Sequence, residues 1–347
     1  MTSFKCSDFE VITDNLGYPE GPVYMKDGSI ILVELKNEQL TRVHPDGSKE
    51  VVAKIKGSPN GAAIGPDGNM YICNSGGFDW LPIPLPKQKL WITGDLPDNY
   101  TGGSIDKVNL QTGSVETLYK DCSIGRRLDM ATMQWQEQAL TPEFQLRGPD
   151  DLVFDQTGGM WITDWGKNTE RSRDITGIYY ASADGKSIKQ MVFPLNAPNG
   201  IALSPDGKRL YTVETYTRKV LYWELSAPGV IEPNPKSIDG TYLLMSMPGQ
   251  EILDSMAVDV EGNLYIASML PEGNNPYSNG GISVISPQGE LLEFIEIKLS
   301  DDFFAPLPSN ICFGGKDNKT AFITLGASGV LIKVQMKIAG LTLAYNG

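Results

Sequence analysis

The sequence predicts an all-β fold, a six-bladed β-propeller with four-stranded blades whose N-terminal strand closes the last blade. Two decapeptides, PNGAAIGPDG at 59–68 and PNGIALSPDG at 198–207, are nearly identical and belong to a longer series of related segments. Each segment consists of an apolar run, a turn rich in Gly and Asp, and a second apolar run. Asp-Gly supplies the positive φ that a tight hairpin needs. The apolar residues show no sustained period of 3.6 residues, so long helices are not expected.

The series has six copies of this strand–turn–strand unit. The copies begin at residues 19, 59, 149, 198, 253 and 308. Alternating segments follow several copies, and four strands per unit at a spacing of roughly 40–55 residues are typical of propeller blades. We therefore expect residues 1–347 to form one propeller domain, with a long aromatic and Pro-rich insertion at about 76–148. Segment 329–337 should be the third strand of the last blade, and segment 9–16 its fourth.

Composition excludes several classes of partner. The formal net charge of −13 argues against nucleic acid, whose phosphates require a basic surface. No apolar run reaches the length of about 18 residues that a membrane span needs, and the N-terminus lacks the pattern of a secretory signal. The sequence therefore predicts a cytoplasmic protein with no nucleic-acid or membrane partner. Its oligomeric state is left open.

His44 is the one histidine of the chain, and this low number excludes several catalytic mechanisms. It lies in TRVHPDGS, where we expect a surface turn. A Ser-His-Asp triad needs an imidazole beside its nucleophile, and an HExxH zinc site needs two. The four cysteines have no CxxC spacing, so neither a disulfide framework nor a zinc site is expected. Catalysis must depend on carboxylates, amides and a hard metal ion.

The start of each repeat carries the candidate site. In a propeller the first strand of every blade lines the central channel, so its first residue lies on the rim. These rim residues are Glu20, Asn60, Asp150, Asn199, Asp254 and Ser309. Converging carboxylates repel one another and lose solvation, which costs several kcal/mol unless a cation compensates. We expect one divalent ion, Ca²⁺ first, with Mg²⁺, Mn²⁺ and Zn²⁺ as alternatives. The other interpretation is that these side chains only cap local turns.

Four motifs resemble one known family. PEGPVY, PDDLVFDQTGGMWITD, PNGIALSPDG and LDSMAVDVEGNLYIA are similar to the gluconolactonase, regucalcin (senescence marker protein) and luciferin-regenerating enzyme family, and the resemblance covers essentially the whole chain. It implies a six-bladed propeller with a divalent metal on its axis, and in many members the hydrolysis of lactones. It also implies metal ligands at Glu20, Asn199 and Asp254, with Asp254 as the candidate catalytic base.

The chain departs from the family's pattern at two places. Asp150 stands where the family usually has Asn, so we expect it as a fourth metal ligand and as a second catalytic candidate. Some members have a substrate-binding Arg two residues earlier, where this chain has Gly148, with Arg147 one residue further back. The expected substrate contacts are Arg147, Asn60 on the rim and Trp165, which directly follows a second strand.

These observations predict a divalent-metal-dependent hydrolase of a small lactone-like molecule. A metal ion polarises the carbonyl and lowers the pKa of a bound water, and Asp254 or Asp150 takes the water's proton. The alternatives are a metal-dependent phosphotriester or fluorophosphate hydrolase, and a non-enzymatic propeller that binds calcium or a partner. The insertion at 76–148 is either a lid over the substrate or a surface packed on the propeller's flank or on a second subunit.

Overall fold

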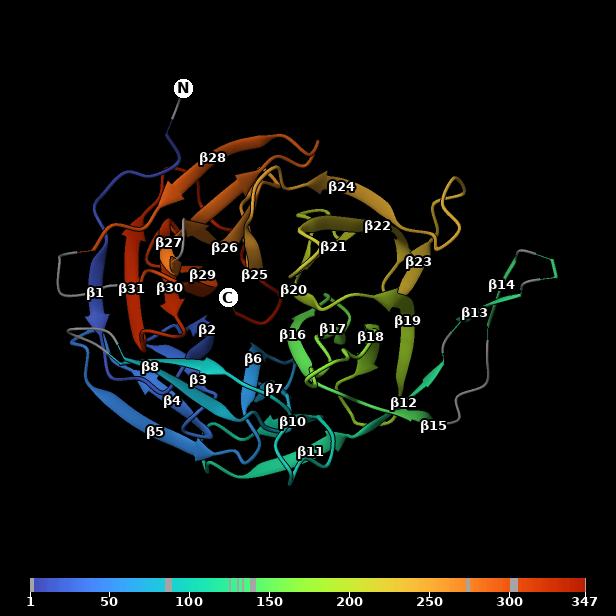
Figure 1. The fold of residues 1–347 in the computed structure, drawn as a ribbon, viewed down its shortest axis with the longest axis horizontal. Coiled ribbons are helices and arrows are strands. Elements are labelled where there is room, and N and C mark those ends of the chain that lie inside the picture. The colour runs from blue at the N-terminus through green and yellow to red at the C-terminus, as the bar shows by residue number, and fades with distance from the viewer. Residues whose placement is uncertain are drawn as a thin grey trace.

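Strands dominate the structure, and no helix occurs among the residues described. The computed structural model describes residues 3–84, 89–124, 126–129, 131–132, 134–137, 142–272, 275–299 and 305–346. Six sheets of four to six strands surround a central axis (Figure 1), which confirms the predicted six-bladed propeller. In this part of the chain there is also no helix long and apolar enough to cross a membrane.

In each blade the first three strands are antiparallel and follow one another outward from the axis in chain order. The innermost strands are β2 (Pro19–Tyr24), β6 (Pro59–Ile64), β16 (Pro149–Phe154), β20 (Pro198–Leu203), β25 (Ile252–Val258) and β29 (Pro308–Gly314). The second strands are β3 (Ile30–Glu34), β7 (Met70–Asn74), β17 (Gly159–Asp164), β21 (Arg209–Glu214), β26 (Leu264–Glu272) and β30 (Thr320–Leu325). The third strands are β4 (Gln39–Val43), β10 (Ser104–Val108), β18 (Thr176–Ser182), β22 (Lys219–Ala227), β27 (Asn275–Ile285) and β31 (Val330–Gln335).

The fourth strands form the outer edges of the blades. They are β5 (Lys49–Lys54), β11 (Val115–Tyr119), β19 (Ile188–Leu195), β24 (Tyr242–Ser246), β28 (Leu291–Glu296) and β1 (Glu10–Thr13). The last of these comes from the N-terminus: β1 pairs antiparallel with β31, with Glu10 opposite Lys333. The predicted closure of the ring by the N-terminal strand is therefore confirmed. In the fourth blade, β23 (Val230–Glu232) pairs with the other half of β22.

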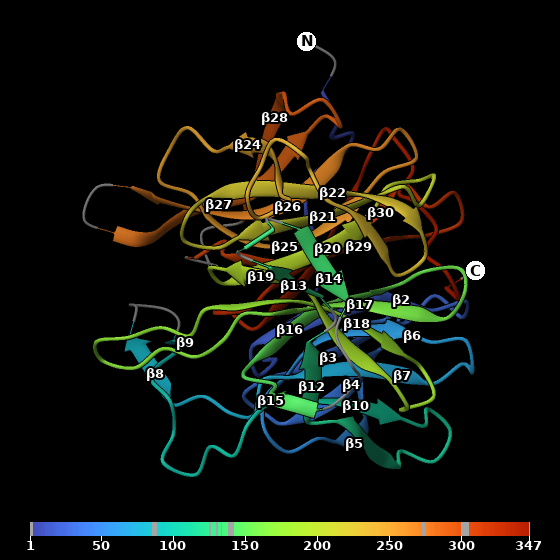
Figure 2. The ribbon, with the colours of Figure 1, turned by 90° about the vertical axis from the view of Figure 1, so that its right-hand side faces the viewer.

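The structure divides the stretch 76–148 that the sequence indicated as one insertion. Strands β10 and β11 lie within it and complete the second blade. Before them, β8 (Trp80–Pro84) and β9 (Lys89–Thr93) form a hairpin. After them come β12 (Asp121–Ile124), β13 (Arg126–Asp129), β14 (Gln134–Glu137) and β15 (Pro142–Gln145), and β12 extends the third blade by pairing with β19. The β13–β14 pair lies at the periphery in Figure 1, whereas β8–β9 extends from one face of the disc in Figure 2.

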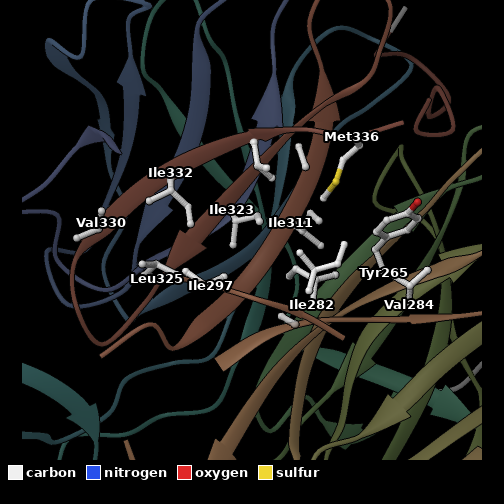
Figure 3. Packing of buried hydrophobic residues seen from close by; sticks show 14 residues of the cluster. Tyr265, Ile282, Val284, Ile297, Ile311, Ile323, Leu325, Val330, Ile332 and Met336 are labelled. Atoms are coloured by element: carbon white, nitrogen blue, oxygen red, sulfur yellow. The ribbon is translucent and has the colours of Figure 1, made fainter. Parts of the chain in front are cut away.

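The hydrophobic core lies between neighbouring blades. Figure 3 shows one such cluster, where Tyr265 and Ile282 of the fifth blade meet Ile323 and Ile332 of the sixth. All four side chains are fully buried. Burying a large apolar side chain contributes about 1.5–3 kcal/mol, so these inter-blade clusters hold the ring together.

The C-terminal tail covers one end of the axis. The backbone amide of Leu341 donates to Val258, and that of Gly340 donates to Asn318, with N···O distances of 2.8 Å. Further on, the ring of Tyr345 packs on Phe154 of the third blade at 5.9 Å. A cavity of about 110 Å³ lies between this tail and the innermost strands. Figure 2 places the C-terminus on the face opposite the β8–β9 hairpin.

We predict that Trp161→Ala destabilises the protein by about 3–5 kcal/mol, because it removes a large side chain from a closed core. Trp161 is fully buried, packs with Ile178 and Trp223, and lies 4.7 Å from the ring of Tyr180. Urea unfolding measures the loss. As a control, Leu243→Ala removes a side chain that is 58% exposed and should cost less than about 0.5 kcal/mol. Equal losses for both variants would contradict this view of the core.

Candidate active site

The six innermost strands share one irregularity at the rim. In each of them the pairing with the second strand shifts just after its first residues. The shifts lie between Glu20 and Val23, Pro59 and Ala62, Pro149 and Leu152, Pro198 and Ile201, Leu253 and Met256, and Pro308 and Asn310. Such bulges redirect side chains and are common beside active sites. In five blades the rim residue lies within the shift, whereas Glu20 is still paired with Val33 and the shift follows it.

Glycines after the rim residues let neighbouring innermost strands approach closely. A Cβ atom on Gly61 would lie 2.5 Å from the carbonyl oxygen of Asp150, and one on Gly200 would lie 2.6 Å from the nitrogen of Met256. Only glycine fits where two backbones come this near. The approach allows Asn60 Nδ2 to donate to Asp150 Oδ2 at 2.8 Å. Two predicted site residues from different blades are thus in direct contact.

Burial and the charges of neighbouring carboxyl groups raise the pKa of three rim carboxyl groups. Burial raises the pKa of Glu20 to about 7, and hydrogen bonds from Asn310 and the Gly21 amide only partly offset it. Burial, followed by the negative charge of Glu20, raises the pKa of Asp254 well above its usual range. Asp150 is raised by burial and then by the charges of Asp254 and Glu20. Without a cation, the folded protein therefore holds protons on these groups near neutral pH.

The donor set of the rim fits a hard divalent ion when carboxamides are included. Within the described residues, no three carboxylate, thiolate or imidazole groups converge closely enough to hold an ion by themselves. Asn199 supplies an amide oxygen, Oδ1, that accepts a weak hydrogen bond from Ser255 at 3.3 Å. Carboxylate and amide oxygens are the ligands that Ca²⁺ and Mg²⁺ prefer. A cation among them would also reverse the upward pKa shifts of the three carboxyl groups.

The predicted substrate-contact residues have different surroundings. The indole of Trp165 donates to Thr215 Oγ1 at 3.2 Å, and the same oxygen accepts from Asn199 Nδ2 at 3.4 Å. Trp165 is therefore linked to a rim residue through one hydroxyl. Arg147, in contrast, forms an ion pair with Asp174 at 2.8 Å. Its guanidinium is already engaged within the third blade.

Sequence analysis missed four side chains that the structure brings to the rim. Tyr18 has a φ of 59°, and burial together with the charges of Asp254 and Glu20 raises its pKa. Lys167 is only 2% exposed, donates to the Gly77 carbonyl at 2.8 Å, and has a pKa lowered to about 7 by burial. Arg173 and Tyr216 complete the set, with the guanidinium 4.6 Å from the ring. The repeat pattern predicts only that loops before first strands and after second strands end at this rim, and it does not indicate which of their side chains face the axis.

A family comparison agrees with this geometry. Residues 18–327 match the family profile described as the SMP-30/gluconolactonase/LRE-like region. The chain belongs to this family. This confirms the resemblance that the rim motifs indicated. The matched region covers the first five blades and the two inner strands of the sixth, β29 and β30.

Individual members of the family are distant in sequence. The gluconolactonase of Zymomonas mobilis is 25% identical over 95% of this chain and 82% of its own length. Lactonase drp35 of Staphylococcus epidermidis is 26% identical over 78% of this chain and 66% of its own length, just under two thirds. The crystal structure of regucalcin from Agrobacterium tumefaciens, a calcium-binding protein, superposes with a TM-score of 0.67 at 16% identity, covering 100% of this chain and 99% of that one. The last comparison supports the fold alone.

We predict that Glu20→Gln stabilises the metal-free protein above pH 7, by about 3 kcal/mol. The ordinary pKa of 4.5 is raised to about 7 in the folded state, so the folded protein binds this proton more tightly than the unfolded chain. That contribution is complete below pH 4.5 and is lost as pH rises through 7, and Gln has no proton to lose. Urea unfolding in chelator across this pH range measures the difference.

The exposed Glu116 provides the control for this prediction. Glu116→Gln should follow the wild-type pH dependence. Parallel wild-type and Glu20→Gln curves at every pH would contradict the electrostatic account of the rim. At a saturating concentration of a divalent ion the wild type should be more stable than Glu20→Gln, because the Glu20 carboxylate binds the ion and the neutral amide of Gln binds it less well.

Proposed function

We propose that this chain is a divalent-metal-dependent lactonase that opens a cyclic ester to a hydroxy acid. The observation that carries the proposal is that Glu20, Asp150 and Asp254 lie on one rim, at the end of the axis opposite the tail, where burial and neighbouring negative charges raise the pKa of each. A rim that only bound a protein partner would gain nothing from buried like charges. The relatives named gluconolactonase and lactonase support the reaction class.

Glu20, Asp150, Asn199 and Asp254 would hold one divalent ion, with Ca²⁺ as the first choice. The description of the Agrobacterium neighbour as a calcium-binding protein supports this choice. When bound, the ion would supply Lewis-acid polarisation of the lactone carbonyl and would lower the pKa of water. Its positive charge would also keep the carboxyl groups ionised at neutral pH, as a base requires.

Asp254 is the preferred general base. It is half-buried, whereas Glu20 and Asp150 are buried, so it is the most accessible of the three to water from the mouth. Asp254 would take a proton from the water that attacks the carbonyl carbon. The ring C–O bond then breaks, and the ring oxygen leaves with a proton as the new hydroxyl. Asp150, oriented by the amide of Asn60, is the second candidate for the base.

We predict that Asp254→Asn lowers kcat for lactone opening by about 10²- to 10⁴-fold at saturating divalent ion, the usual contribution of a general base. Acid release in a pH-stat is the measurement, with each divalent ion and with chelator. Asp317→Asn changes an exposed carboxyl in the β29–β30 turn and serves as the matched control. Chelation should abolish wild-type activity, and added ion should restore it.

The proposal fails if no lactone releases acid while metal is bound to the protein. In that case the same pH-stat assay with phosphotriesters and fluorophosphates tests the phosphorus-directed alternative. Activity there would reassign the reaction and keep the metal site. Binding of an ion without turnover of either substrate class would leave a calcium-binding propeller.

A further inference from the structure

Five aromatic rings form a continuous chain around the carboxyl groups of the rim. They come from loops of four blades: Tyr18 precedes β2, Phe78 and Trp80 lie at the start of the β8–β9 hairpin, Trp165 follows β17, and Tyr216 follows β21. Consecutive ring centroids are separated by 5.3 Å (Tyr18–Trp80), 6.4 Å (Trp80–Phe78), 6.4 Å (Phe78–Trp165) and 5.9 Å (Trp165–Tyr216). These are contact distances for aromatic pairs. We call this set the aromatic arc.

Both halves of the arc lie next to rim residues. Tyr18 lies two residues before Glu20 and directly precedes the first innermost strand. Trp165 shares the hydroxyl of Thr215 with Asn199. A molecule whose carbonyl is bound at the rim would therefore lie next to Tyr18 and Trp165.

Cations hold parts of the arc in place. Lys167 Nζ lies 3.5 Å from the centroid of Phe78 and donates to the Gly77 carbonyl, so it fixes the start of the β8–β9 hairpin. The guanidinium of Arg173 lies 4.0 Å from Trp165 and 4.6 Å from Tyr216, and its NH2 group donates to the Trp165 carbonyl. Rings held in this way are ordered before a ligand arrives, which lowers the entropic cost of binding.

The rings are only partly covered by the protein. Tyr18, Phe78 and Trp80 pack on the core of the first two blades, yet all three remain partly exposed, as does Trp165. Tyr216 is 48% exposed. A hollow of about 630 Å³ also borders Phe78 and Trp80, but it is lined by polar residues such as Lys36 and Asn74, and its described lining includes none of the rim carboxyl groups. Each of the five ring residues therefore keeps some surface that a bound lactone can contact.

We propose that the lactones preferred by this chain carry an apolar alkyl or aryl substituent that packs on the aromatic arc. The inference rests on the proposed lactonase function and specifies its substrate class. Apolar and aromatic groups gain free energy when they leave water for such a surface. The hydroxyl groups of a sugar lactone would lose hydrogen bonds to water there without replacement, which is unfavourable.

The test compares kcat/KM for δ-phenyl-δ-valerolactone, δ-valerolactone and glucono-δ-lactone at saturating divalent ion. The wild type should favour the phenyl compound over δ-valerolactone by roughly 10- to 100-fold, the value of burying one such group. Trp80→Ala should reduce that preference by about 10-fold, through a larger rise in KM for the phenyl compound than for δ-valerolactone. Trp80→Phe retains a ring and should restore most of the preference.

Tyr242→Ala provides the matched control, because it removes one ring of another aromatic pair, Tyr222–Tyr242, on the outer edge of the fourth blade. It should leave all three values unchanged. A wild-type preference for glucono-δ-lactone, or an equal loss on all substrates in a folded Trp80→Ala protein, would overturn this inference and leave the lactonase proposal intact. Failure of the wild type to open any of the three lactones would instead contradict the proposed function itself.

Discussion

The repulsion among the carboxyl groups of Glu20, Asp150 and Asp254 is the constraint on which the rest of the site depends. It arises from repetition, because the corresponding residue of each blade, at the bulge near the start of the innermost strand, lies on the same rim. Burying such groups together costs several kcal/mol. The inter-blade cores supply the stability that tolerates this cost, and a divalent cation would remove most of it. Propeller architecture and metal chemistry are thus two consequences of one repeated segment.

Different segments of the chain lie over the two ends of the axis. At one end the C-terminal tail crosses from the Asn318 turn to Phe154 and covers the channel. At the other end the β8–β9 hairpin reaches over to the last blade, where Leu90 packs with Leu307 and the Trp91 amide donates to Ala327. Because the hairpin begins at Phe78 and Trp80, it carries two rings of the aromatic arc with it. This arrangement favours the lid interpretation for the first part of 76–148 and leaves the peripheral β13–β14 pair outside it.

The sequence was sufficient to predict the structural features that the repeated segment determines. Six copies of one segment were enough to find the blades and the rim residues, and the alternating segments 9–16 and 329–337 were enough to find the closure. Features that depend on loop paths were not predictable in this way. Nothing local distinguishes Lys167 from a surface lysine, and its burial follows from the β8–β9 hairpin folding over it. Similarly, the sequence did not indicate that the guanidinium of Arg147 binds Asp174, because the two residues are 27 positions apart in the chain.

Calorimetric titration of the metal-free protein with Ca²⁺, in buffers of different ionisation enthalpy, tests the central claim most directly. If the axial carboxyl groups hold protons that a cation displaces, one ion should bind per chain and should release protons at pH 6. The release should diminish toward pH 8, above the pKa of about 7 for Glu20. No binding, or binding without proton release at pH 6, would contradict the account of a rim whose carboxyl groups require a cation.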